Sequence, residues 1–142
     1  MRLRTDAWVA AALGLLAFVT RWVQRGHGLY SWDSGLLASG IVEYDFAASH
    51  PHPPFYPLAI GLGKLVALWT GPVEAFAVLS VIASAVMVAF TYLAARGILS
   101  WVPAAFAAVL LVLSPTALFN GVDALTYALE GASSAVVAWA AW

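Results

Sequence analysis

The residues best suited to chemistry stand in one short interval of the chain. It begins with Trp32-Asp33-Ser34-Gly35 and continues, after a gap, with His50-Pro51-His52-Pro53-Pro54-Phe55-Tyr56-Pro57-Leu58. These two motifs place an acid, two histidines and four prolines in a sequence that is otherwise apolar. A carboxylate beside an apolar surface can have its pKa tuned, and it can then act as a general base or bind a metal. We therefore expect any reaction centre to lie here.

Asp33 allows two interpretations. Residues 34–42, which follow it, carry apolar side chains at helical spacing. Asp33 could therefore be a helix N-cap, whose carboxylate accepts hydrogen bonds from the first backbone N–H groups. It could equally be a catalytic acid or base at the edge of a membrane. The sequence leaves both interpretations open.

His50 and His52 are separated by one proline. Two histidines at this spacing can bind a metal, but they are weak evidence for zinc, which takes more protein ligands. They could also contact a substrate phosphate, or form ordinary hydrogen bonds beside a turn. A divalent cation is compatible with this loop, and nothing in the loop demands one. The surrounding prolines exclude a regular helix before about Phe55, so we expect a rigid entry into the next helix.

Five further charged residues lie near this interval or beyond it. Lys64 either extends to the membrane interface or contacts an anionic head group. Asp123 either caps the next helix or contacts the substrate. Glu43 and Asp45 are expected to be solvated loop charges, and either could act as a second carboxylate. Glu130 stands in an apolar pattern, where a charge is costly unless it faces protein or a cavity.

The composition identifies the class of protein. Hydrophobic residues make up 63% of the chain and charged residues only 9%, and the mean hydropathy is +0.91. A soluble domain carries roughly 25% charged residues, so we expect an integral membrane protein in contact with membrane lipids. The net charge of −1 and the lack of a basic patch exclude a nucleic-acid partner. The absence of cysteine excludes disulfides and thiolate metal sites.

Three segments are apolar enough to cross a bilayer, which takes about 20 residues. They are Ala7–Val23, Val73–Ala95 and Trp101–Phe119. The first qualifies if Arg21 extends to the interface, as long basic side chains near helix ends do. The last apolar stretch, Ala132–Trp142, is too short to cross, so the sequence looks as if it were cut within a span.

The segment Pro54–Trp69 is also apolar, but Lys64 interrupts it. If it lies on the membrane surface or re-enters the membrane, then Arg2, Arg4 and Arg96 share the cytoplasmic side, as the positive-inside rule favours. Two other basic residues, Arg21 and Arg25, fall outside and weaken this argument. The expected fold is an all-α integral membrane protein: a multi-span helical bundle with a juxtamembrane or re-entrant helix in the first external loop. Residues 1–142 form a single unit with a cytoplasmic N-terminus.

The order of these features resembles the N-terminal part of a GT-C fold glycosyltransferase. The closest likeness is to bacterial relatives of the protein O-mannosyltransferases and of the lipid A aminoarabinose transferases. The shared features are a basic start, a first span, the Trp32–Gly35 motif, a proline-rich run, Ser114-Pro115 and an outward-facing Asp123. The run from His50 to Leu58 is similar to the H-P-H-P-P-G-Y-P-L of that bacterial group, with Phe55 in place of its glycine.

This resemblance implies a transferase of the bacterial inner membrane. It would take a sugar from a polyprenyl-phosphate-linked donor, at the external face, and pass it to a protein, lipid or glycan acceptor. Asp33 would be the catalytic base or organise the site, and His50, His52, Lys64 and Asp123 would bind substrate. Members of these families are much longer than this chain, so we expect the 142-residue piece to be inactive by itself. The alternative is a small transporter or a membrane interaction subunit without catalysis, which leaves the loop with Asp33 unexplained.

Overall fold

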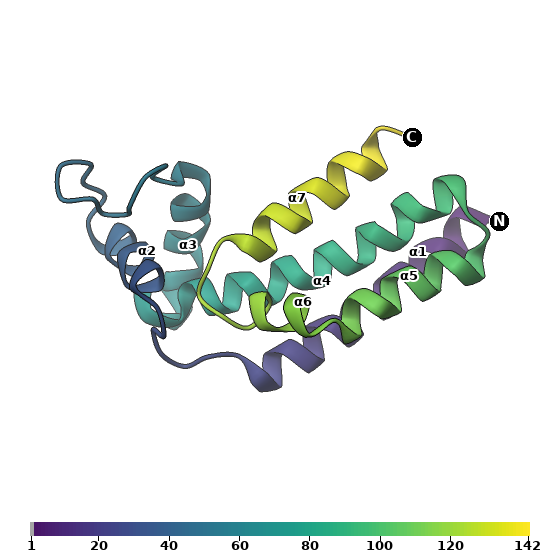
Figure 1. The fold of residues 1–142 in the computed structure, drawn as a ribbon, viewed down its shortest axis with the longest axis horizontal. Helices are drawn as coiled ribbons and strands as arrows, with labels where there is room; N and C mark the ends of the chain where they lie inside the picture. The colour runs from purple at the N-terminus through teal and green to yellow at the C-terminus, as the bar shows by residue number, and fades with distance from the viewer. Residues whose placement is uncertain (1) are drawn as a thin grey trace.

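A computed structural model describes residues 2–142, and all regular structure in that range is helical (Figure 1). The coarse expectation of an all-α protein is thereby confirmed. The seven helices in chain order are α1 (Arg2–Gln24), α2 (Trp32–Val42), α3 (Pro57–Thr70), α4 (Pro72–Ile98), α5 (Trp101–Leu113), α6 (Pro115–Asn120) and α7 (Tyr127–Ala140).

Two of these helices, α1 and α4, are long and apolar enough to cross a membrane. At 1.5 Å per residue, the 23 residues of α1 and the 27 of α4 extend about 35 and 40 Å. The hydrocarbon core of a bilayer is about 30 Å thick. Helix α4 is the centre of the fold, because α1, α3, α5 and α7 all pack on it.

Helices α1 and α4 approach closely at Gly14. A Cβ atom there would lie 3.1 Å from the carbonyl oxygen of Ala85 and 3.3 Å from Cβ of Ala89. Small residues at such a contact let two backbones come together, which is typical of helix pairs in membranes. Next to this contact, Val88 and Tyr92 of α4 are buried with Ala108 of α5.

The segment expected to form one continuous span is divided in two. Helix α5 ends at Leu113, and α6 begins at Pro115. Proline has no N–H, so the helical hydrogen bond from position 115 to the carbonyl of Leu111 is not available. The hydroxyl of Ser114 accepts a hydrogen bond from the N–H of Ala117 and caps α6 instead. With 13 residues, α5 is about 20 Å long, shorter than a bilayer core.

Helices α2 and α3 lie across the end of the bundle at which α4 begins (Figure 1). Buried Leu37 of α2, Ile60 of α3 and Phe76 of α4 form one core cluster that holds this end together. Helix α3 begins at Pro57, because Phe55 and Tyr56 adopt positive φ angles of 67° and 42° that a helix cannot accommodate. Its 14 residues extend about 21 Å, less than a crossing requires.

The two ends of the bundle differ in charge. The end that carries the start of α1, the end of α7 and the α4–α5 turn (Figure 1) holds two arginine side chains and one acidic side chain among those that the structure describes. These residues are Arg4, Arg96 and Asp6. At this end, Nε of Arg96 lies 2.9 Å from Oδ1 of Asp6, and the hydroxyl of Tyr92 donates to the same oxygen over 2.8 Å.

Among the described residues, the opposite half of the bundle, with α2 and α3, holds three cationic and six acidic side chains. They are Arg21, Arg25, Lys64, Asp33, Glu43, Asp45, Glu74, Asp123 and Glu130. We call it the acidic end and the other the basic end.

Candidate functional site

Helix α2 forms one wall of the candidate site, and Ser31 is the N-cap of this helix. The hydroxyl of Ser31 accepts a hydrogen bond from the N–H of Ser34 over 3.1 Å, and the hydroxyl of Ser34 accepts from the N–H of Ser31 over 3.1 Å. This reciprocal capping satisfies backbone donors that a helix leaves open. The interpretation of Asp33 as the N-cap is therefore wrong. Asp33 is the second residue of the helix, and its side chain is exposed.

The loop from Glu43 to Tyr56 is ordered by its own aromatic side chains. The ring centroid of Phe46 lies 5.2 Å from that of Tyr44 and 4.6 Å from that of Phe55. The hydroxyl of Tyr44 donates to the carbonyl of Phe55 over 3.0 Å. Asp45 and His50 exchange two backbone hydrogen bonds of 2.9 and 2.8 Å. The loop therefore presents its histidines from a defined backbone.

Gly40 lets this loop sit against α2. A Cβ atom at Gly40 would lie 2.7 Å from Cδ of Pro51 and 2.9 Å from its backbone nitrogen. Real Cβ atoms essentially never come so close. Pro51 is itself fully buried. Glycine at position 40 is thus required by the close approach of the proline-rich loop.

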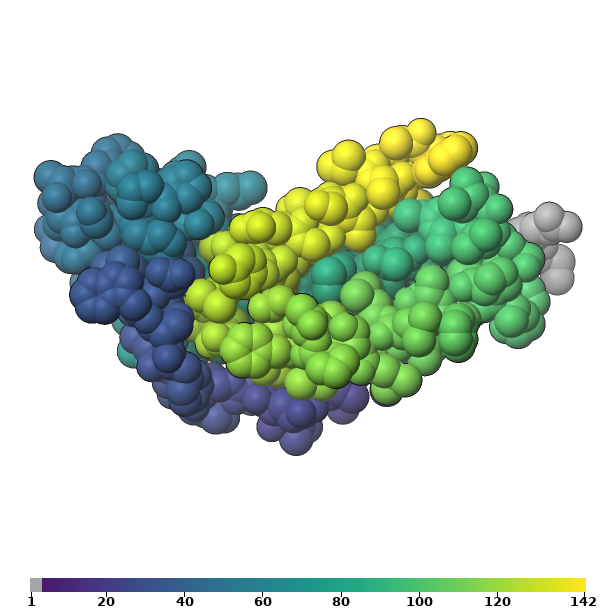
Figure 2. Space-filling model, viewed as in Figure 1, coloured from purple at the N-terminus to yellow at the C-terminus, as the bar shows by residue number. Residues whose placement is uncertain are grey.

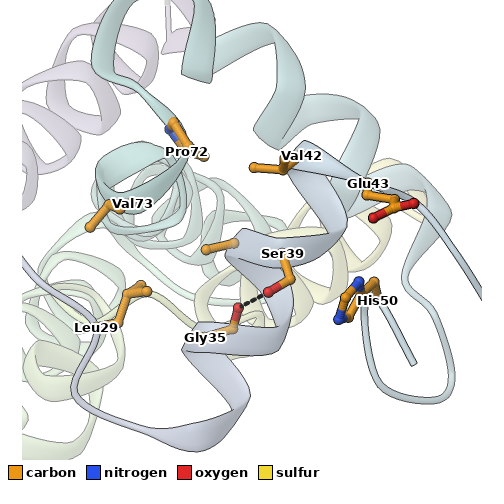
Figure 3. A pocket seen from close by; sticks show the side chains of 9 residues that line it. Leu29, Gly35, Ser39, Val42, Glu43, His50, Pro72 and Val73 are labelled. Atoms are coloured by element: carbon orange, nitrogen blue, oxygen red, sulfur yellow. Dashed lines mark hydrogen bonds between the residues drawn. The ribbon is translucent and has the colours of Figure 1, made fainter. Parts of the chain in front are cut away.

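A cavity of about 320 Å³ lies between α2, the loop and the start of α4. Figure 3 shows Glu43 and His50 on one side of it and Leu29, Pro72 and Val73 on the other. The size is within the range of small-molecule sites, roughly 300–1,000 Å³. Most of the wall is apolar, so a few polar atoms determine what the cavity can bind.

Three polar side chains line this cavity. The hydroxyl of Ser39 donates to the carbonyl of Gly35 over 2.9 Å (Figure 3), so its oxygen remains free to accept. Nδ1 of His50 is buried and has no hydrogen-bond partner in the described part of the chain. Glu43 adds a carboxylate. The hydroxyl oxygen of Ser39 and the carboxylate of Glu43 are both acceptors, so the arrangement suits a small hydrogen-bond donor beside an apolar wall.

The other expected site residues do not line this cavity. The ring of His52 meets the ring of Tyr56 edge-on, with centroids 5.4 Å apart, and its Nδ1 is also buried without a partner among residues 2–142. Nζ of Lys64, an exposed residue of α3, lies 5.9 Å from the ring centroid of Tyr44. His52 thus belongs to the ordered loop, and Lys64 approaches that loop from α3.

Asp123 lies apart from these residues, in the link between α6 and α7. It is 7% exposed, and its carboxylate accepts a hydrogen bond from the N–H of Ala124 over 2.8 Å. The cap position of α7 belongs to Thr126, so the alternative in which Asp123 caps that helix is wrong. Of the five expected site residues, the cavity includes only His50, and Asp33 stands on the helix that forms its wall. In the described residues, no group of three His, Asp or Glu side chains is arranged to hold a metal.

Arg21 corrects a further expectation. It does not extend to an interface, because its side chain is fully buried between α1, α4 and α5. Nη2 donates to the carbonyls of Val112, over 2.9 Å, and Leu111, over 3.3 Å, while Nε donates to the hydroxyl of Ser84 over 3.1 Å. No carboxylate forms an ion pair with it within the described chain.

The break at Pro115 explains why Arg21 is buried there. The carbonyls of Leu111 and Val112 lie in the last turn of α5, where helical donors are missing. The guanidinium supplies those donors. One signal in the sequence points to this pairing: a proline four residues after an apolar position leaves a free carbonyl, and an arginine in a neighbouring span can bind it.

The chain has been compared with protein-family models, with curated proteins and with solved structures. None of the three comparisons gives a match, so the residues described above carry the functional argument.

Proposed function

We propose that this protein is a membrane glycosyltransferase of the GT-C type, or the front part of one. It transfers a sugar from a polyprenyl-phosphate carrier to an acceptor hydroxyl at the external membrane face. The observation that carries the proposal is that Asp33 is exposed and does not cap its helix. Its carboxylate is exposed at the acidic end of an apolar bundle, and Ser31 has taken over the capping role that would otherwise explain it.

Exposed apolar side chains support the membrane location. Large residues of α1 and α5 face outward, among them Trp8, Leu15, Leu16, Val23, Phe106, Leu110 and Leu113. A soluble protein rarely exposes such continuous apolar surface. The basic end would lie in the cytoplasm, in agreement with the positive-inside rule. The acidic end, with Asp33 and the histidines, would then face outward, and α2 and α3 would lie along that membrane surface.

The proposed reaction uses Asp33 as general base. The acceptor hydroxyl loses its proton to the carboxylate, and its oxygen forms a bond to the anomeric carbon of the sugar. The bond from that carbon to the phosphate oxygen breaks, and polyprenyl phosphate leaves with the electron pair. Positioned acid–base groups typically contribute 10²–10⁴-fold in rate. The polyprenyl tail stays in lipid throughout, which is why the base must stand at the membrane edge.

The leaving phosphate needs hydrogen-bond donors or cations. Lys64 offers an exposed ammonium group on α3. His50 and His52 offer Nδ1 atoms that have no partner within residues 2–142. All three residues belong to the loop or to the helix that follows it.

The test is a transfer assay in native membranes that carry the protein as the cell makes it. Membranes from the wild type and from a deletion strain receive polyprenyl-phosphate-linked mannose, glucose or aminoarabinose, each with a radioactive sugar. We expect label to enter a membrane acceptor only where the protein is present, with one of the sugars. Equal incorporation in the deletion strain for all three sugars would contradict the proposal and favour the transporter or interaction-subunit alternative.

A further inference from the structure

A second hollow lies between α3 and α7. It measures about 470 Å³, and Figure 2 shows the surface hollowed between these two helices. Leu58 and Leu62 line it from α3, and Leu129, Glu130, Ser133 and Ser134 line it from α7. We call it the α3–α7 cleft. Its volume is in the range of small-molecule sites.

Glu130 is the one charged side chain that lines the cleft in the described part of the chain. Glu130 is an exposed residue in the first turn of α7, and its carboxylate is therefore accessible to a ligand in the cleft. Here the hydroxyl of Thr126 donates to Oε1 of Glu130 over 3.0 Å. That bond orients the carboxylate and leaves most of its lone pairs free for a ligand.

The other hydroxyl groups of α7 in the cleft have already used their protons. Ser133 donates to the carbonyl of Leu129 over 2.8 Å, and Ser134 donates to the carbonyl of Glu130 over 2.9 Å. Their oxygens can therefore only accept. Together with the carboxylate, the α7 side of the cleft presents hydrogen-bond acceptors and no side-chain donor to a ligand.

The side chains of α7 accept hydrogen bonds, and the phenol of Tyr56, which lines the cleft from the side of α3, can also donate one, so together they select the chemistry of the ligand. A phosphate group would bring negative charge next to Glu130 with no cation on the cleft wall, so the geometry disfavours it. A ligand with several hydroxyl groups can donate to the carboxylate and to both serine oxygens. The leucines of the wall, among them Leu58 with 77% of its surface exposed, accommodate an apolar portion of the same molecule.

We infer that the α3–α7 cleft binds the hydroxylated head group of an amphiphile, with Glu130 accepting its principal hydrogen bond. This assigns the hydroxyl-bearing partner of the transfer to the cleft and the donor phosphate to another place. The assignment rests on the proposed function. Binding in the cleft needs no turnover, however, so the two can be tested separately.

The test uses the whole chain in lipid nanodiscs with a single cysteine, Leu62→Cys, in the cleft. The chain has no cysteine of its own, so the rate of maleimide labelling reports occupancy of this position alone. Three probes with the same tail and different head groups are added below their micelle concentrations: octyl β-D-glucoside, octylamine and octyl phosphate. We expect the glucoside to slow labelling at the lowest concentration.

Two substitutions make the test specific for Glu130. Glu130→Gln replaces a charged acceptor with a neutral one of about half the strength, so the protecting concentration of glucoside should rise at least about fivefold. Glu74→Gln removes a carboxylate at the same end of the bundle but outside the cleft, and it should change nothing. Thermal unfolding of each variant checks that the fold is retained.

Several results would overturn the inference. Equal protection by all three probes would show binding of the tail alone, and strongest protection by octylamine or octyl phosphate would show a site for another head group. If Glu130→Gln does not change the concentration of glucoside that protects the cysteine, Glu130 does not contribute to binding in the cleft. Asp33→Asn should leave protection by glucoside intact, so loss of transfer without loss of protection separates a failure of the proposed reaction from a failure of this site.

Discussion

The guanidinium of Arg21 donates a hydrogen bond of 2.9 Å to the backbone carbonyl of Val112, 91 positions further along the chain. This bond joins the end of α1 to the last turn of α5, where helical donors are missing. A charged side chain thus substitutes for main-chain hydrogen bonding inside the bundle.

Substitution of Arg21 should be strongly destabilising. Arg21→Met keeps an apolar stem of similar length but leaves the carbonyls of Leu111 and Val112 and the hydroxyl of Ser84 without their donor. Buried unsatisfied groups cost about 1–3 kcal/mol each, so we expect the free energy of unfolding to fall by about 3 kcal/mol. Reversible unfolding in mixed micelles measures it. Arg25→Met is the control: its guanidinium stacks 4.0 Å from the Trp22 ring centroid, a contact with a contribution of about 1 kcal/mol.

Pro115→Ala should soften the effect of Arg21→Met. Alanine restores an N–H that can bond to the carbonyl of Leu111, so one group that Arg21 satisfies gains a second donor. In a double-mutant cycle we expect the two substitutions to couple by at least about 0.5 kcal/mol. Strictly additive effects would mean that the break in α5 and the burial of Arg21 are independent features.

Substitutions of Asp33 and Ser31 should have different effects, the first on sugar transfer and the second on protein stability. Asp33→Asn removes the proposed base, but the capping bonds of Ser31 stay in place, so we expect transfer in native membranes to fall at least about a hundredfold with normal protein levels. Ser31→Ala removes the cap and should lower stability by about 1 kcal/mol while transfer continues. The opposite pattern, with activity in Asp33→Asn and none in folded Ser31→Ala, would refute the assignment of Asp33.

Gly40 and Gly35 form a matched pair on the same helix. Gly40→Ala places a methyl group against Pro51 and should displace the loop, at a cost of about 1–3 kcal/mol typical of overpacking. At Gly35 an added Cβ meets nothing within 4 Å, so Gly35→Ala should stabilise α2 by up to about 1 kcal/mol. Thermal unfolding of both variants gives the comparison. Similar shifts of the same sign would show that the loop does not depend on Gly40.

The orientation in the membrane can be tested without removing any native cysteine, because the chain has none. Ser49→Cys lies at the acidic end and Asn120→Cys at the last residue of α6, and both should react with an impermeant thiol reagent added to intact cells. Ser100→Cys, in the α4–α5 turn at the basic end, should react only after the cells are opened. Labelling of Ser100→Cys but not of Asn120→Cys in intact cells would contradict the proposed topology.

The sequence by itself determined the features that depend on local chemistry. Composition and the length of the apolar runs predicted an all-helical chain and both long helices. Hydropathy and helical periodicity can be read from residues that are close together in the sequence. Prolines in the loop predicted a delayed start of the next helix, and the structure begins it at Pro57. The sequence also predicted that a polar side chain caps the N-terminus of α2, although the cap is Ser31 and not Asp33.

Only the tertiary structure decided which distant groups satisfy each other. Arg21 looked like an interfacial side chain because its partners, Ser84 and the carbonyls at 111 and 112, are at least 63 positions away. The same holds for Glu130, whose surroundings depend on where α3 packs on α4 rather than on its own helix. Pairings of this kind follow from helix packing across the whole bundle. A local sequence pattern shows that a buried polar group needs a hydrogen-bond partner, but it does not identify that partner.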